Sequence, residues 1–423
     1  MSDSQPSRPL GFGSLLALGV NGIVGVGIFF IPADLARFAP GYGSVGLLAM
    51  TALALSPIVL VYALLAARFD EDGGPVLYAR AAFGDTVGFF VGWLAYLSAI
   101  ASTSAVIFNL SLRGLWPALA PVLSLDPESS WGPRLLAISI TLALAALCSR
   151  GLKLSARAWS TLTVLKLIPL LALVSFGALK SAPPTAASAS PSSWAQAMLV
   201  AVFVFQGFEI VPVVAGRASR ASKSVPVAML AAVGLSALLY MALQLVAVRA
   251  VPDLSSSRSP LVDVGQAVGG GGLATLIRLG TNISALGIAI GMVTMTPWYL
   301  ATAAKHSLGA GLADVSELGV PRRALAVTTV LVVVLVSMGS NADLFALSSL
   351  AVVIQYLTAA LALLVLAKRS IVHVLVSSIA AVLALLIASG ASSRELLVAS
   401  VGVVLGLITK LALKPAAPSV LSQ

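Results

Sequence analysis

The sequence predicts an all-α integral membrane protein with about twelve transmembrane helices, and three observations support this fold class. Apolar residues make up 59% of the 423 residues, and charged residues only 9%. The mean hydropathy is +1.04, whereas an ordinary soluble domain is about 25% charged. Apolar stretches of about 20 residues, long enough to cross a bilayer, recur along the whole chain. Most of the surface is therefore expected to face lipid or neighbouring apolar helices.

These apolar stretches follow one another from the N-terminus. They cover residues 12–38, 43–67, 83–115, 134–150, 154–180, 194–216, 225–248, 273–303, 323–340, 343–367, 370–389 and 395–413. Two segments rich in serine, proline and glycine, 181–193 and 252–272, are predicted loops. We expect no cleavable signal peptide, because residues 1–11 are polar and no small-residue cleavage site follows the first stretch.

Lysine and arginine predict the orientation. With the N-terminus in the cytoplasm, 16 of the 25 basic residues fall on the cytoplasmic side and eight on the outer side. This bias follows the positive-inside rule and predicts a multi-pass protein of the cell (inner) membrane with both termini cytoplasmic. The net charge of +10 needs no nucleic-acid partner, because a nucleic-acid binder gathers its basic residues on one polar face.

Several chemistries lack their sequence signatures. The single cysteine, Cys148, excludes an intrachain disulfide framework and thiolate metal sites. His306 and His373 lie far apart in no metalloprotease motif, and the glycine run 269–272 has no Gly-Lys-Ser/Thr ending. No selectivity segment or ring of charges typical of a channel is evident. We therefore expect no catalytic residues, no metal and no other cofactor, and a protein that is not an enzyme.

Two of the apolar stretches contain interruptions that a simple membrane anchor would not need. The first consists of Gly22, Ile23, Val24, Gly25, Val26 and Gly27. The second contains Phe203, Gln206, Gly207, Phe208 and Glu209. Each glycine weakens a helix by about 1 kcal/mol relative to alanine. Broken helices at matching places in two halves of a membrane protein indicate the binding site of a transporter.

A broken helix can bind a zwitterion with few charged side chains. The half-helix that begins near Gly25 and Gly27 offers free N–H groups and its positive dipole end to a carboxylate. The half-helix that ends near Phe203 and Gln206 offers free carbonyl groups to an ammonium. The alternative is that these glycines only let helices pack closely, as small-xxx-small patterns do.

Five segments resemble those of amino acid–polyamine–organocation (APC) transporters, in the expected order. Residues 68–93 resemble the first cytoplasmic loop of that superfamily, with its Gly73-Gly74-Pro75 turn. The ranges 22–29 and 203–209 resemble its broken first and sixth helices. Residues 151–169 resemble the fourth loop and fifth helix, and 251–261 the outer loop before helix 8. The chain thus looks like a basic or neutral amino acid permease.

The resemblance implies a leucine-transporter-like fold of two inverted five-helix repeats with broken helices 1 and 6. Residues 1–180 would hold helices 1–5, residues 181–369 helices 6–10, and residues 370–423 helices 11 and 12 with the cytoplasmic tail. It also implies secondary active transport of amino acids by alternating access. The chain departs from the superfamily pattern after helix 6, where 216–220 lacks the acidic pair, and after helix 8, at 304–307.

Two charged residues are candidates for proton coupling. Lys166 lies nine residues after Arg157, about 13 Å along a helix and close to the middle of the bilayer. A lysine withdrawn from water can exchange a proton during a transport cycle. In proton-coupled relatives, a helix 5 lysine stands where sodium-coupled relatives bind a cation, and the resemblance carries this role to Lys166. Glu209 is an intramembrane carboxylate, with hydrogen bonding to loop backbone as the alternative role.

The remaining candidates concern the substrate side chain. Gln206 either contacts the substrate or bonds to another helix, Phe203 resembles an aromatic gate, and Trp298 lines the pocket if its helix is turned that way. With Glu209 as the only carboxylate close by, a neutral amino acid is the favoured substrate. The alternatives are an amino acid or amine exchanger or exporter, or a carrier-like nutrient sensor. The sequence leaves a monomer or a homodimer open.

Overall fold

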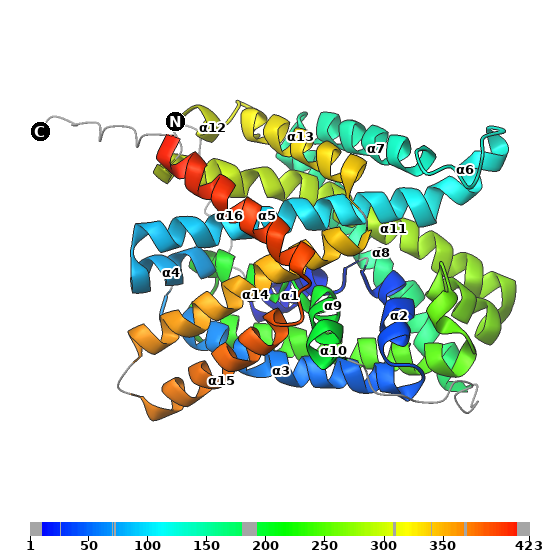
Figure 1. Ribbon diagram of the computed structural model, residues 1–423, viewed down its shortest axis with the longest axis horizontal. Coiled ribbons are helices and arrows are strands. Elements are labelled where there is room, and N and C mark those ends of the chain that lie inside the picture. The colour runs from blue at the N-terminus through cyan, green and yellow to red at the C-terminus, as the bar shows by residue number, and fades with distance from the viewer. Residues whose placement is uncertain are drawn as a thin grey trace, which may run out of the picture.

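The computed structural model describes residues 11–25, 27–69, 71, 73–179, 193–307, 310–339, 341–367 and 370–412, and the regular elements in these residues are helices (Figure 1). In chain order, the first part contains α1 (Phe12–Ile23), α2 (Gly27–Phe38), α3 (Tyr42–Ala66), α4 (Pro75–Phe83), α5 (Asp85–Asn109), the π-helix η1 (Leu110–Leu115), α6 (Trp116–Val122), α7 (Gly132–Cys148) and α8 (Leu152–Leu179).

The second part of the chain follows after Ser193. It contains α9 (Trp194–Phe205), the 3-10 helix η2 (Phe208–Arg217), α10 (Ala221–Ala250), the 3-10 turn η3 (Leu254–Ser256), α11 (Pro260–Ser307), α12 (Ala310–Ala313), α13 (Arg322–Met338), α14 (Asn341–Leu366), α15 (Ile371–Ala388) and α16 (Ser393–Ala412). Ser193 begins α9 by accepting a hydrogen bond from the N–H of Gln196, as an N-cap residue does.

The prediction of an all-helical membrane protein is confirmed. Each of the twelve predicted spans overlaps a helix or a pair of helices. Among the described residues, six helical stretches are long and apolar enough to cross a membrane, and α1 with α2, bent by 49°, makes a seventh if the pair is one span. The stretches Gly132–Cys148, Leu165–Leu179 and Trp194–Phe205 are apolar but shorter. The count of twelve remains a prediction.

One loop prediction is wrong. The segment 252–272 is helical from Pro260 onwards, because Pro260 supplies the fixed φ and missing N–H that suit the first position of a helix. Gly270, with φ 70° and ψ −167°, then interrupts α11. Glycine-rich composition predicts a loop, but here the glycines make a sharp bend between two helical stretches. The other predicted loop, 181–193, lies outside the described residues except for Ser193.

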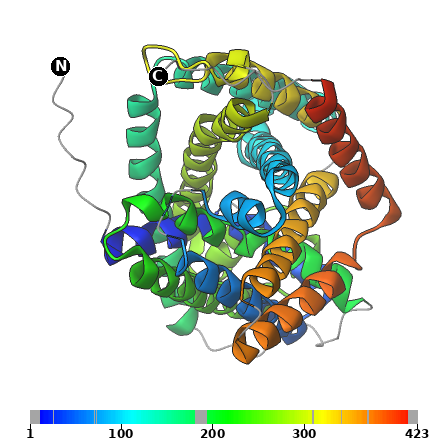
Figure 2. The ribbon, with the colours of Figure 1, turned by 90° about the vertical axis from the view of Figure 1, so that its left-hand side faces the viewer.

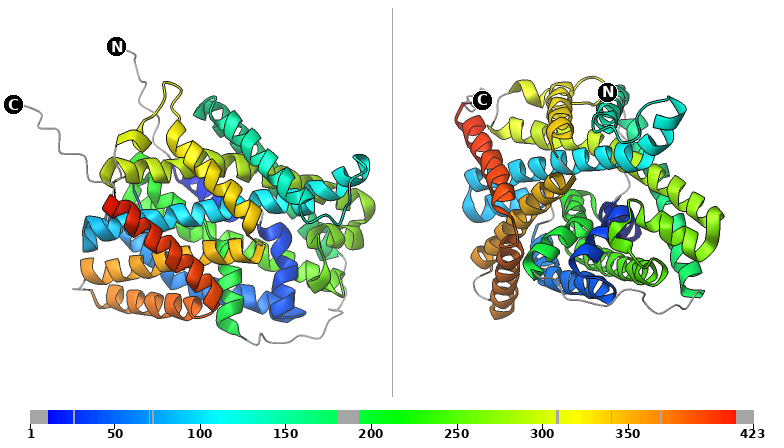
Figure 3. Two further views of the ribbon diagram at one scale, coloured as in Figure 1. Left: turned by 45° about the horizontal axis from the view of Figure 1, so that its top comes forward. Right: turned by 45° about the vertical axis from the view of Figure 1, so that its right-hand side comes forward.

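The long helices run side by side as a bundle around the short helices α1 and α9, whereas the short helices α4, α6 and α12 lie at its edges (Figure 1). Figure 1 shows α1 and α9 in the middle of the molecule, and Figure 2 views many of the surrounding helices nearly end-on. α15 and α16 lie on the outside (Figure 3). Only 22% of the α15 span is buried inside the protein, so this helix faces lipid on most of its surface.

Candidate functional site

The first interruption separates α1 from α2. α1 ends at Ile23, the N–H of Val24 still bonds to the carbonyl of Val20, and the N–H of Gly25 turns back to the carbonyl of Ile23 at 2.7 Å. α2 then begins at Gly27 in a new direction. The last carbonyls of α1 and the first N–H groups of α2 thus lack helical partners. Val26 lies outside the described residues.

The second interruption follows α9. Gln206 is extended, with φ −62° and ψ 150°, and Gly207 has φ 116°. A side chain is strained in the Gly207 conformation, so glycine is required here. The chain then continues from Phe208 as a 3-10 helix that contains Pro212. The helix therefore breaks where the sequence predicts it.

The two interruptions contact each other through their backbones. A Cβ on Gly22 would lie 2.8 Å from the carbonyl oxygen of Gly207, and one on Gly207 would lie 2.3 Å from the backbone of Gly22. On the α2 side, a Cβ on Gly27 would lie 3.0 Å from the ring of Phe203. The structure thus brings together four of the residues singled out in the sequence, and glycine permits the approach.

Lys166 holds the end of α1. Its side chain is 1% exposed, and its Nζ donates to the carbonyl oxygen of Asn21 at 3.1 Å and to Oδ1 of Asn21 at 2.8 Å. Lys166 therefore contacts the chain one residue before Gly22. A positive charge at the C-terminal end of α1 also complements the helix dipole. Asn21 was not predicted from the sequence, although a polar amide inside an apolar helix, next to Gly22, is typical of a functional residue.

Tyr240, on α10, binds the next carbonyl of the first interruption. Its hydroxyl donates to the carbonyl oxygen of Ile23 at 2.7 Å, and its ring packs on Phe205 with centroids 5.5 Å apart. Tyr240 therefore touches both interrupted helices. No local pattern marked this residue in the sequence, because a tyrosine in an apolar helix is common.

Gln206 joins a hydrogen-bond network between three helices. Its amide nitrogen donates to the hydroxyl of Ser349 at 3.2 Å, and its amide oxygen accepts from Ser348 at 3.0 Å. The Ser348 hydroxyl in turn lies 3.1 Å from that of Ser98 and 2.6 Å from that of Ser102. Of the two roles weighed for Gln206, the interhelical bond is the one seen. The serines could not be predicted, since only the packing of α5 against α14 aligns them.

Glu209 lies directly after the second interruption. One of its carboxylate oxygens accepts a hydrogen bond from the N–H of Gly207 at 2.9 Å, and the hydroxyl of Tyr356 lies beside the same carboxylate. The rings of Tyr62, Phe208 and Tyr356 pack together with centroids 5.3 to 5.8 Å apart. The carboxylate therefore fixes the turn at Gly207 and faces a tyrosine cluster.

The remaining predicted residues divide into two groups. Ile23, Val24 and Phe208 are buried at the interruptions. The ring of Phe203 packs against that of Phe345, with centroids 4.3 Å apart and planes tilted by 51°. Trp298 lines a pocket whose other lining residues come from outside the two interruptions.

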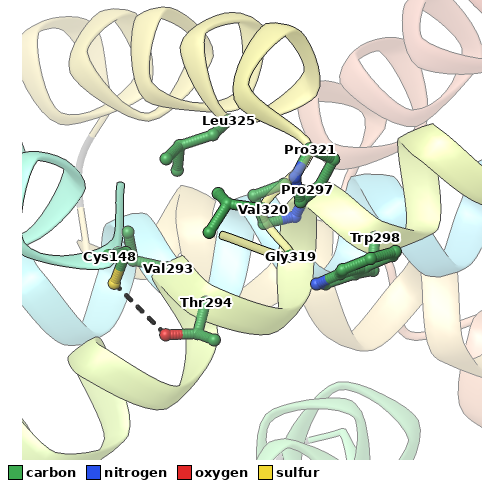
Figure 4. A pocket seen from close by; sticks show the side chains of 9 residues that line it. All are labelled: Cys148, Val293, Thr294, Pro297, Trp298, Gly319, Val320, Pro321 and Leu325. Atoms are coloured by element: carbon green, nitrogen blue, oxygen red, sulfur yellow. Dashed lines mark hydrogen bonds between the residues drawn. The ribbon is translucent and has the colours of Figure 1, made fainter. Parts of the chain in front are cut away.

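Figure 4 shows where Trp298 lies instead. It lines a pocket of about 220 Å³ beside Val320 and Cys148, whose Sγ is 3.2 Å from the hydroxyl of Thr294. The α11 residue that faces Gly25 is Ile288, ten residues earlier and thus about 15 Å along the helix. That Trp298 binds substrate together with Gly25 remains a prediction.

Known proteins that resemble this chain are transporters. An uncharacterized transporter of Mycobacterium tuberculosis is 26% identical over 359 residues, covering 82% of this chain and 78% of its own. An arginine/ornithine antiporter of Pseudomonas aeruginosa is 30% identical over 349 residues, covering 78% and 70%. A methylthioribose transporter of Bacillus subtilis is 26% identical over 257 residues, covering 58% and 56%.

The model of the amino acid permease family matches residues 10–373. This range contains both interrupted helices, together with Lys166, Tyr240 and Ser348, which bond to residues of the interruptions or beside them. The chain therefore belongs to the amino acid permease family of the APC superfamily, whose members are membrane transporters and not enzymes.

Proposed function

We propose that the protein is a secondary active transporter that binds a neutral amino acid where its two interrupted helices cross. The carboxylate binds the free N–H groups at the start of α2, and the ammonium binds free carbonyls at the end of α9. The residues that form this site are Gly22, Ile23, Val24, Gly25, Val26, Gly27, Phe203, Gln206, Gly207 and Phe208. The observation that carries the proposal is the backbone contact between Gly22 and Gly207.

We propose a neutral substrate because Lys166 and Glu209 already have partners within the protein. Lys166 bonds to Asn21, and Glu209 bonds to the turn at Gly207. A cationic side chain needs a carboxylate that is free to pair with it, and Glu209 is already engaged in the turn. The antiporter among the relatives acts on arginine and ornithine, so substrate charge is the first point to measure.

Lys166 supports coupling to protons. The protonated amine donates to both oxygens of Asn21 and so holds the end of α1 against α8. Loss of the proton removes the charge from these bonds, and charged hydrogen bonds are about twice as strong as neutral ones. We propose that deprotonation frees α1 to move while α2 stays in place, which opens the site to one side. Glu209, beside the turn, is the second candidate for proton handling.

The proposed topology places this site midway across the cell membrane. We propose twelve spans in two inverted repeats, helices 1–5 and 6–10, with α15 and α16 as peripheral helices 11 and 12. Both termini are then cytoplasmic, and the protein works as a monomer or a homodimer. Helix pairs that cross a bilayer with a break near its middle are typical of transporters built from such repeats.

Exchange is the second candidate mode, because one relative is an antiporter. Proteoliposomes loaded with unlabelled amino acid and diluted into trace radiolabelled amino acid test binding and turnover by counterflow. Uptake into empty vesicles under an inward proton gradient then separates the modes. Proton symport requires accumulation in empty vesicles, whereas an exchanger needs the internal amino acid. Saturable binding without counterflow would identify a sensor and overturn the proposed transport.

A further inference from the structure

A second pocket lies next to the interrupted helices, at the end of the molecule where α2 and α10 finish. It has a volume of about 320 Å³ and is lined by Phe29, Phe30, Arg113, Gly114, Ser259, Val262, Arg278, Thr281 and Asn282. Phe30 is three residues past Gly27, about 5 Å along α2. Under the proposed topology, this pocket opens on the outer side, directly outside the central site.

Two irregular backbone features build the pocket. The bend at Gly270 folds α11 back on itself, so Ser259 and Arg278 line one pocket, although a straight helix would separate them by about 28 Å. The π-helix η1 presents Arg113 and Gly114 from the other side. A Cβ on Gly114 would lie 2.3 Å from Oδ1 of Asn282, so the π-helix is pressed against α11. Such π-helical turns occur often at functional sites.

The charge of the pocket is positive. Arg113 and Arg278 are the charged residues that line it, and the guanidinium of Arg113 lies 5.3 Å from the ring centre of Phe30. The nearby Asp34 attracts both Arg37, 3.3 Å away, and Arg113. Asp34 is not among the lining residues, so the two arginines make the lining itself positive.

The N-terminus of α11 adds to the positive potential of the pocket. Ser259 and Val262, in its first turn, line the pocket, and a helix N-terminus attracts anions. Asp263, in the same turn, is outside the lining and accepts a hydrogen bond from Ser257. Guanidinium groups and a helix N-terminus are the donors that carboxylates prefer, and the rings of Phe29 and Phe30 offer an apolar surface beside them.

From these features we propose that the pocket is a subsite for small carboxylates, which receives the substrate carboxylate before it reaches the interrupted helices. Its place on the substrate route rests on the proposed function, whereas its ligand chemistry does not. Arg113 and Arg278 bind the carboxylate, and the two phenylalanine rings contact its aliphatic part.

Propionate is a suitable probe, with neutral propionamide as its matched control. The full-length protein is purified in a neutral detergent and chloride-free buffer, and its unfolding temperature is recorded during titration, since a ligand that binds only the folded state raises it. We expect propionate to stabilise the wild type and propionamide to leave it unchanged. Loss of a charged hydrogen bond should weaken propionate binding about tenfold or more in Arg113→Gln and in Arg278→Gln.

Two further variants show where propionate binds. Arg258→Gln removes a positive charge from the same end of the molecule, where Arg258 pairs with Glu128, and should bind propionate like the wild type. Gly25→Ala meets only ordinary contacts and fills the central site, and it should also retain propionate binding. Arg278 is exposed, so Arg278→Gln tests the proposal even if Arg113→Gln fails to fold.

The outcomes separate the subsite from the central site. Absence of stabilisation, or unchanged binding in both arginine variants, overturns the subsite. Loss in Gly25→Ala with retention in the arginine variants places the carboxylate at the interrupted helices and also overturns it. Arginine-dependent stabilisation seen only in nanodiscs with phosphatidylglycerol, and not with phosphatidylcholine, assigns the pocket to a lipid phosphate instead. If amino acid counterflow fails but propionate binding still depends on the two arginines, the proposed function is rejected and the subsite is supported.

Discussion

Gly22 and Gly207 face each other across the two interrupted helices, and a Cβ on Gly207 would lie 2.3 Å from the carbonyl oxygen of Gly22. Residues 185 positions apart in the sequence therefore meet backbone to backbone. The contact requires glycine at both positions, since a Cβ on either residue would meet the other backbone. It also makes each break depend on the other for its position.

Gly207→Ala should disturb the fold and abolish uptake. The added methyl group meets the Gly22 backbone, and the backbone of Gly207, at φ 116°, suits only glycine. We expect a loss of at least about 2 kcal/mol in the free energy of unfolding, measured by thermal unfolding in detergent.

Gly13→Ala is the matched control. Nothing lies within 4 Å of a Cβ at Gly13, and alanine favours a helix by up to about 1 kcal/mol over glycine. This variant should unfold at or slightly above the wild-type temperature and transport normally. Equal behaviour of the two variants would show that the contact between the breaks is looser than described.

Lys166→Ala should remove the response of uptake to a proton gradient. The variant loses both bonds to Asn21 and with them the group proposed to change protonation. Uptake of radiolabelled amino acid into proteoliposomes, measured at several external pH values with and without a gradient, checks this expectation. A retained pH response in the variant contradicts the coupling role.

The control for this charge removal is Lys223→Ala. Lys223 is an exposed lysine at the start of α10, so its loss changes the net charge equally without touching α1. Its pH response should match the wild type. Lys166→Arg gives a further comparison, because arginine keeps the positive charge but does not release its proton, so binding without gradient-driven uptake is expected.

The sequence predicted the elements of the site better than their contacts. The breaks were predictable because glycines fall inside apolar stretches near Gly25 and at Gly207, and each one weakens a helix. The burial of Lys166 is seen, whereas its depth in the bilayer stays a prediction. Asn21 and Tyr240 were missed, because each acts on a carbonyl that only tertiary packing brings within reach.

The wrong loop prediction has a local cause, and the role of Trp298 stays a prediction for a related reason. The segment 252–272 is rich in glycine and serine, as loops are. Gly270 instead forms the bend between two helical stretches of α11. The direction of Trp298 depends on the rotation of α11 around Pro297, and a hydrophobic helix gives no periodic pattern from which to read it. Composition thus indicates where a chain bends or crosses a membrane. The direction in which a side chain points depends on neighbours that lie far away in the sequence.

Tyr240→Phe should weaken the first interruption without a change in packing volume. The hydroxyl that donates to Ile23 is lost, and a buried carbonyl is left without this donor, at a cost of about 1 kcal/mol. We expect a lower unfolding temperature and an apparent substrate affinity reduced about fivefold, measured by thermal unfolding and by concentration-dependent uptake. Tyr42→Phe, where an exposed hydroxyl accepts from Arg249, should leave both unchanged.

The bond between Gln206 and Ser348 can be tested by a double-mutant cycle. Gln206→Leu keeps the side-chain size but removes the acceptor for Ser348 and the donor for Ser349. Ser348→Ala removes the partner from the other helix. Each change alone should destabilise the protein, because a polar group is left unpaired in an apolar interior.

Together the two changes should cost less than the sum of the single changes, by about 0.5 to 1.5 kcal/mol, since the second mutation removes a partner that is already lost. The free energies come from reversible unfolding in mixed micelles. Additive costs would mean that the network does not hold the second interruption. If Gln206→Leu also alters the ranking of amino acids in counterflow, the amide contacts the substrate side chain as well as α14.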